Sequence, residues 1–141
     1  MVQLFDTFTG FDEEEAVYEM NAGHCDQKFV DVFKNTGVEY VLNKMKYKEK
    51  CVVRKGLFPQ TTKGIETKFK FVSIDVDFEK SIYASLEYFY PRLIKGGFLF
   101  IHDYTSQLKG VRYAVERYEK TFGTVVKVPI ADKGGSLLVT K

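Results

Sequence analysis

Short apolar runs that end at acidic residues are the feature of this sequence that most constrains its fold. Three runs follow the pattern, namely residues 2–5 before Asp6, residues 69–74 before Asp75, and residues 98–101 before His102 and Asp103. Between the last two, Ile82, Leu86 and Phe89 recur at the spacing of one helix face. Apolar strands that alternate with amphipathic helices are typical of βαβ units. The sequence therefore predicts an α/β protein with a mainly parallel sheet.

Further elements are predicted around this pattern. The apolar spacing favours a helix over residues 26–34 that ends before Gly37, and the polar, acidic residues 7–23 indicate a loop or a short helical lid. Gly96 and Gly97 are expected to separate a helix from the strand that follows. The other expected elements are an amphipathic segment at residues 38–45, a strand at 51–53, a turn-rich loop at 56–64, a helix at 111–122, and an antiparallel pair of strands at 125–128 and 137–140. Without repeats or linkers, we expect one domain spanning residues 1–141.

Charge and composition argue against several classes of protein. The net charge is only +2, so neither a nucleic acid nor an anionic membrane is a predicted partner, and the basic stretch at residues 44–55 is interpreted as solvated surface. No apolar run approaches the roughly 18 residues of a membrane span. No signal peptide is visible either, so we expect a cytoplasmic protein. Two cysteines, Cys25 and Cys51, cannot by themselves form a disulfide framework or a metal cluster.

Acidic residues at strand ends are candidates for ligand binding, because open α/β sheets bind ligands at the carboxyl ends of their strands. Asp6 can accept hydrogen bonds from the two hydroxyls of a ribose, or it can cap a turn. Spacing alone favours neither interpretation.

The stronger candidate site combines residues from two strand ends: Asp75, Asp77, His102 and Asp103. Hard divalent cations such as Mg²⁺ take oxygen ligands, and an added imidazole also suits Mn²⁺, Fe²⁺ or Zn²⁺. The alternative is that Asp77 only caps the helix beginning near Glu79 and that His102 is an ordinary packed ring. Both interpretations remain open from the spacing.

Five motifs in order connect the chain to a known family. They are FDTFTGF at residues 5–11, KGLFPQT at 55–61, FVSIDVD at 71–77, FYPRL at 89–93 followed by Gly96-Gly97, and IHDY at 101–104. The set resembles the macrocin-type (TylF/MycF) sugar O-methyltransferases and, more distantly, catechol O-methyltransferase. The resemblance implies a Rossmann-like class I methyltransferase sheet that ends in an antiparallel strand. It also implies S-adenosylmethionine-dependent methylation of a small-molecule or sugar hydroxyl.

The resemblance also implies roles for individual residues. Asp6 would bind the ribose of S-adenosylmethionine, with Gly56 and Leu57 near its adenine. Asp75 would lie close to the cofactor and, with His102 and Asp103, would ligate a divalent metal, Mg²⁺ first. The metal would lower the pKa of the acceptor hydroxyl and align it for direct methyl transfer, which makes Asp75 and His102 the candidate catalytic residues. Alternatively, His102 would act as a general base. Relatives often carry two acids where this chain has His102-Asp103.

One departure from the family pattern concerns the amino-terminal part of the fold. In class I methyltransferases, a first strand, a glycine-rich turn and a helix hold the methionine half of the cofactor, whereas this chain begins at the second strand. We therefore expect the sheet to pair differently, to leave a slot or to borrow a strand. We also expect weak cofactor binding and a homo-oligomer. The alternative function is a truncated, non-catalytic methyltransferase-like domain with a binding or assembly role.

Overall fold

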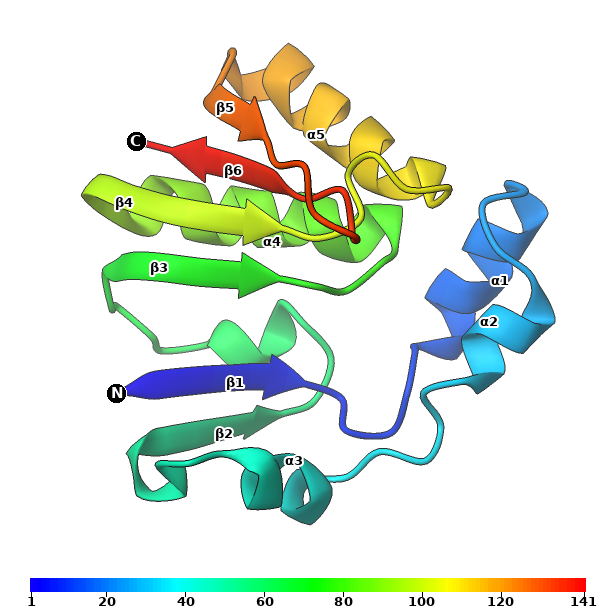
Figure 1. The fold of residues 1–141 in the computed structure, drawn as a ribbon, viewed down its shortest axis with the longest axis vertical. Coiled ribbons are helices and arrows are strands. Elements are labelled where there is room, and N and C mark those ends of the chain that lie inside the picture. The colour runs from blue at the N-terminus through cyan, green and yellow to red at the C-terminus, as the bar shows by residue number, and fades with distance from the viewer. The chain divides into compact units, whose positions relative to one another are not determined.

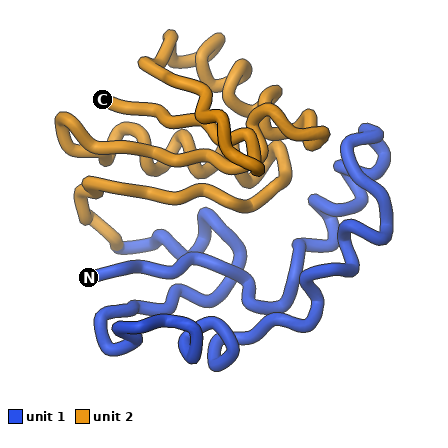
Figure 2. Tube along the Cα trace, viewed as in Figure 1, with its two compact units in different colours: residues 1–64 blue, residues 65–141 orange.

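The computed structural model describes residues 1–141 as two compact units, residues 1–64 and residues 65–141 (Figure 2). Each unit has its own sheet. Compact units are not the same as independently folding domains, so the expectation of one domain over residues 1–141 stays a prediction. No helix of either unit has the length and apolarity needed to cross a lipid bilayer.

The first unit is built on two parallel strands, β1 (Val2–Asp6) and β2 (Cys51–Lys55), with Val2 opposite Cys51 and Asp6 opposite Lys55. Their connection contains the helices α1 (Glu13–Asn21), α2 (Gln27–Asp31) and α3 (Val38–Lys44) and the 3-10 turn η1 (Lys48–Lys50) (Figure 1). A second 3-10 turn, η2 (Gln60–Thr62), follows β2. The sequence prediction of a lid at residues 7–23 corresponds to α1 and the turns on either side of it.

Capping side chains explain where the first two helices begin. The Asp12 carboxylate accepts a hydrogen bond from the Glu15 N–H at 3.1 Å, and the Asp26 carboxylate accepts one from the Phe29 N–H at 2.9 Å. Phe29 stacks on Phe11 with ring centroids 5.5 Å apart. The helix α2 is therefore fixed at its start by its cap and packed against the segment that precedes α1.

The second unit contains a four-stranded sheet in the order β3-β4-β6-β5 (Figure 1). Its strands are β3 (Phe69–Ile74), β4 (Leu93–Ile101), β5 (Val126–Pro129) and β6 (Leu137–Thr140). The strands β3 and β4 are parallel, while β6 is antiparallel to both of its neighbours, β4 and β5. The predicted α/β class, with a mostly parallel sheet and an antiparallel carboxyl-terminal strand, is confirmed.

The core of the second unit lies between one face of this sheet and two helices, α4 (Glu79–Arg92) and α5 (Lys109–Phe122). Alternate strand residues are buried, as expected for side chains that point to one face. They are Val72, Ile74, Leu99, Ile101, Leu137 and Val139. The helices contribute Ile82, Leu86, Phe89, Val111, Ala114 and Val115. This packing fixes the strand ends on which the candidate site depends.

Candidate metal and cofactor site

The carboxyl ends of β3 and β4 bring together the three predicted metal ligands. The His102 N–H donates to the Ile74 carbonyl at 2.9 Å, which extends the pairing of Ile74 with Ile101 past the strand ends. As a result, one ligating atom each from Asp75, His102 and Asp103 lies within 4.8 Å of the other two. Asp75 is exposed, whereas His102 and Asp103 are half-buried. The predicted convergence of these three side chains is therefore confirmed, whereas metal binding by them stays a prediction.

Asp77 adds a third acid near this group. Burial raises the pKa of the Asp77 carboxyl to about 7, with the negative charges of Asp75 and Asp103 acting in the same direction and His102 opposing them. The helix α4 has Phe78 as its N-cap residue and no side-chain cap hydrogen bond. The cap position thus falls on Phe78, one residue after Asp77.

The electrostatics of the group favour a bound cation. Burial, followed by the charge of Asp75, raises the pKa of Asp103, while His102 and a hydrogen bond from Ser106 lower it. Carboxylates that repel one another in a partly buried site are stabilised in their charged form by a positive ion. Two carboxylates and an imidazole form a donor set that accepts Mg²⁺ and suits Mn²⁺, Fe²⁺ or Zn²⁺ as well.

A glycine turn before β6 packs directly against His102. A Cβ atom added at Gly134 would lie 2.9 Å from His102 Nδ1, which is closer than real side chains approach. At Gly135, where φ is +61°, an added Cβ would lie 2.0 Å from Thr105 Oγ1. The Thr105 N–H donates to the Gly135 carbonyl at 2.9 Å, so the turn is attached to the segment that follows His102. Only glycine at both positions allows this close approach.

Asp132 stabilises the same turn through hydrogen bonds. Its carboxylate accepts hydrogen bonds from the Ser136 N–H and the Ser136 hydroxyl, both at 2.8 Å. The two hydrogen bonds from Ser136 lower the pKa of Asp132. The sequence indicated only a turn at Gly134-Gly135. The contact of this turn with His102 could not be predicted from a local sequence pattern, because the two residues are 32 positions apart.

The first unit gathers the predicted cofactor residues Asp6, Gly56 and Leu57 at the ends of its two paired strands. The Gly56 N–H donates to the Asp6 carbonyl at 3.0 Å. One carboxylate oxygen of Asp6 accepts a hydrogen bond from the Phe8 N–H at 2.6 Å, so Asp6 does shape a turn, while its other oxygen makes no hydrogen bond. The turn interpretation is correct for one oxygen, and ribose binding by the other stays a proposal.

A buried hydroxyl lies beside Gly56. Thr61 Oγ1 is buried without a hydrogen-bond partner, and a Cβ atom at Gly56 would lie 3.0 Å from Thr61 Cγ2. A side chain at position 56 would therefore press against the Thr61 methyl group. Asp75, the fourth predicted cofactor residue, belongs to the other unit.

Comparisons with known proteins agree on one class of enzyme. The family model of the macrocin O-methyltransferases (TylF) matches residues 1–135. No curated protein matches the chain. Among solved structures, the O-methyltransferase NovP has a TM-score of 0.81 at 17% identity, and the match covers 100% of this chain and 60% of NovP.

Two structures of CalS11 are also similar. The calicheamicin methyltransferase CalS11 has a TM-score of 0.69 at 15% identity, over 98% of this chain and 59% of CalS11. Its apo form, described as a TDP-rhamnose 3'-O-methyltransferase, has a TM-score of 0.57 at 17% identity, over 98% of this chain and 57% of that one. At such identities the structural likeness establishes the fold alone. The chain thus spans about 60% of the length of these relatives.

Proposed function

Because this chain belongs to the macrocin O-methyltransferase (TylF) family, we propose that it acts as an S-adenosylmethionine-dependent O-methyltransferase on the hydroxyl of a sugar or another small molecule. The observation that carries the proposal is the convergence of Asp75, His102 and Asp103 at one edge of the sheet. The description of CalS11 as a TDP-rhamnose 3'-O-methyltransferase favours a sugar hydroxyl as the acceptor.

The three converging residues would hold a divalent metal ion. Mg²⁺ is the first candidate, because two of the donors are carboxylates. A metal bound there supplies positive charge that lowers the pKa of an acceptor hydroxyl in contact with it. Asp75 and Asp103 would supply the carboxylate ligands that hold this charge at the strand ends. The turn at Gly134 keeps the His102 ring in place. Positioning of this kind contributes much of the rate of a direct group transfer.

His102 also offers a route that does not depend on a metal. When the methyl group bonds to the acceptor oxygen, the hydroxyl proton must leave. His102 is half-buried between two carboxylates, and we propose it as the alternative general base that accepts this proton. A single ring nitrogen of His102 cannot be both a metal ligand and a general base, because a lone pair donated to a metal cannot accept a proton.

Four residues are proposed to bind S-adenosylmethionine. Asp6 would accept hydrogen bonds from the ribose hydroxyls through its free carboxylate oxygen, and Gly56 and Leu57 would lie against the adenine. The fourth residue, Asp75, is proposed separately, at the strand end of the second unit taken by itself.

A thermal unfolding experiment tests the metal-assisted function. Excess Mg²⁺, Mn²⁺ or Zn²⁺ should raise the melting temperature, because an ion that binds only the folded state stabilises it, and Asp75→Ala should abolish the rise. The matched control is Glu116→Ala, which removes an exposed carboxylate on α5 and should retain the full effect. Identical melting curves with and without all three ions would refute metal binding. Metal binding without methyl transfer to any sugar acceptor would favour the non-catalytic alternative.

A further inference from the structure

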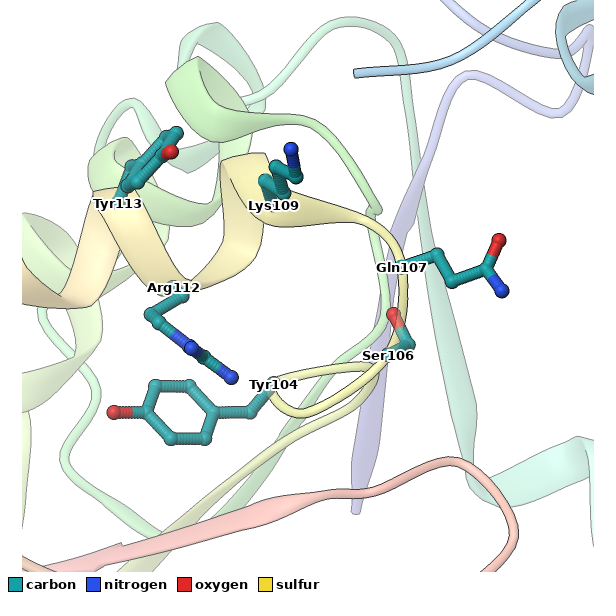
Figure 3. Close-up of a pocket in the computed structure, with 6 residues that line it drawn as sticks. All are labelled: Tyr104, Ser106, Gln107, Lys109, Arg112 and Tyr113. Carbon is teal, nitrogen blue, oxygen red and sulfur yellow. The ribbon is translucent and has the colours of Figure 1, made fainter.

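A pocket of about 520 Å³ lies at the start of α5 (Figure 3). It is lined by Tyr104, Ser106, Gln107, Lys109, Arg112 and Tyr113. All six side chains end in polar groups, two of them carry a positive charge, and none is acidic. A volume of this size falls in the range of small-molecule sites in proteins. Its chemistry therefore favours a polar ligand with negative charge.

The two cations of the pocket are not neutralised by the protein. No carboxylate forms an ion pair with Lys109 or Arg112, whereas Arg117 on the same helix pairs with Glu79 at 2.8 Å. The Arg112 guanidinium carbon lies 5.8 Å from the centre of the Tyr104 ring, toward which its side chain extends (Figure 3). A cation–π contact at this distance leaves the N–H donors of the guanidinium available.

The wall of the pocket is attached to the proposed metal ligands. Tyr104 directly follows Asp103, and the Ser106 hydroxyl donates to the Asp103 carbonyl at 2.9 Å. Ser106 Oγ in turn accepts a hydrogen bond from the Leu108 N–H at 3.1 Å, one residue before α5 begins. A ligand in the pocket would therefore be held at a fixed position relative to Asp103.

We propose that this pocket binds the phosphoryl group of a phosphorylated acceptor, so that the hydroxyl to be methylated is presented toward Asp75, His102 and Asp103. Arginine matches phosphate oxygens in a bidentate manner, and lysine adds a point charge. The Tyr104 and Tyr113 rings offer flat surfaces for the rest of the acceptor. The identity of the ligand as the methyl acceptor rests on the proposed function, whereas binding of a phosphoryl group in the pocket does not.

Calorimetric titration of the 141-residue chain with inorganic pyrophosphate and with uridine diphosphate tests the proposal. EDTA is present throughout, so that binding through a metal ion is removed. Both compounds should bind, and the double variant Lys109→Gln/Arg112→Gln should weaken binding by about tenfold or more, since charge-assisted hydrogen bonds are lost. The control double variant Lys95→Gln/Lys120→Gln also removes two exposed positive charges and should bind like the unmodified chain.

Two further titrations separate this pocket from the other proposed sites. Asp75→Asn should retain pyrophosphate binding, and the Lys109→Gln/Arg112→Gln variant should bind S-adenosylhomocysteine like the unmodified chain. The proposal is overturned if neither phosphate compound binds, if both double variants lose affinity equally, or if the pocket variant loses only S-adenosylhomocysteine. Phosphate binding at the pocket in a protein without methyl transfer would support the pocket and refute the methyltransferase function.

Discussion

At the scale of single residues, the position of the His102 ring depends on a glycine that makes no hydrogen bond to it. Gly134 leaves room for the ring, because a Cβ atom there would lie 2.9 Å from Nδ1 and 3.3 Å from Cε1. The turn cannot easily move away, since the Thr105 N–H donates to Gly135 and Ser136 is bound to Asp132. A methyl group at position 134 would therefore displace the imidazole.

We predict that Gly134→Ala weakens Mn²⁺ binding by about tenfold, the lower end of the effect seen when residues that orient metal ligands are changed. Calorimetric titration with Mn²⁺ measures the loss. Gly37→Ala is the control, because nothing lies within 4 Å of a Cβ atom there. An unchanged Mn²⁺ affinity in Gly134→Ala would show that the ring position does not matter for the site.

Residue patterns predicted the convergence of Asp75, His102 and Asp103 and missed what surrounds these side chains. Asp75, His102 and Asp103 each follow an apolar run, and parallel strands place such residues at one edge whatever the details of packing. The raised pKa of Asp77 arises from burial and from neighbouring charges, which no local pattern encodes. The approach of Gly134 to His102 likewise depends on how β6 returns between β4 and β5.

At the scale of elements, an ion pair links the helices α4 and α5. The Arg117 guanidinium donates to the Glu79 carboxylate at 2.8 Å and lies 3.7 Å from the centre of the Tyr83 ring. The Glu79 side chain is only 11% exposed. Loss of Arg117 would therefore leave a mostly desolvated carboxylate without the positive charge that now stabilises it.

We predict that Arg117→Ala lowers the free energy of unfolding by about 1–3 kcal/mol, through the lost ion pair and the lost stacking on Tyr83. Urea denaturation followed by circular dichroism measures the change. Lys120→Ala on the same helix serves as control, since Lys120 is exposed and forms no ion pair. Equal stability of the two variants would mean that apolar packing alone joins the helices.

Element boundaries differed from the sequence predictions where glycines and short helical turns are involved. Gly96 and Gly97 were expected to precede a strand at residue 98, but both lie inside β4, which begins at Leu93. The register between β3 and β4 shifts there, and a Cβ atom at Gly97 would lie 3.0 Å from the Lys70 carbonyl, so the glycine permits close strand pairing. The helix predicted over residues 26–34 ends at Asp31, where hydrogen bonds spanning three residues replace helical ones.

At the scale of the whole molecule, one face of the second unit's sheet is apolar and exposed. Cross-strand partners share a face, and the row Phe71, Phe98, Thr140 and Val126 lies opposite the buried core residues. Phe71 is 61% exposed and Val126 is 66% exposed. Parallel sheets usually have both faces covered, and contiguous exposed apolar surface is typical of contacts between proteins.

We predict that this face mediates association with a second copy of the chain, which would make the protein a homo-oligomer. The double variant Phe71→Thr/Phe98→Thr keeps residues that favour strands but removes two adjacent aromatic rings, so it should shift the protein toward the monomer in sedimentation velocity. Tyr40→Ser/Tyr47→Ser removes two exposed rings from the first unit instead and should leave the oligomeric state unchanged. A chain that sediments as a monomer at every concentration, before any substitution, would contradict the prediction, because exposed apolar surface would then be tolerated without a partner.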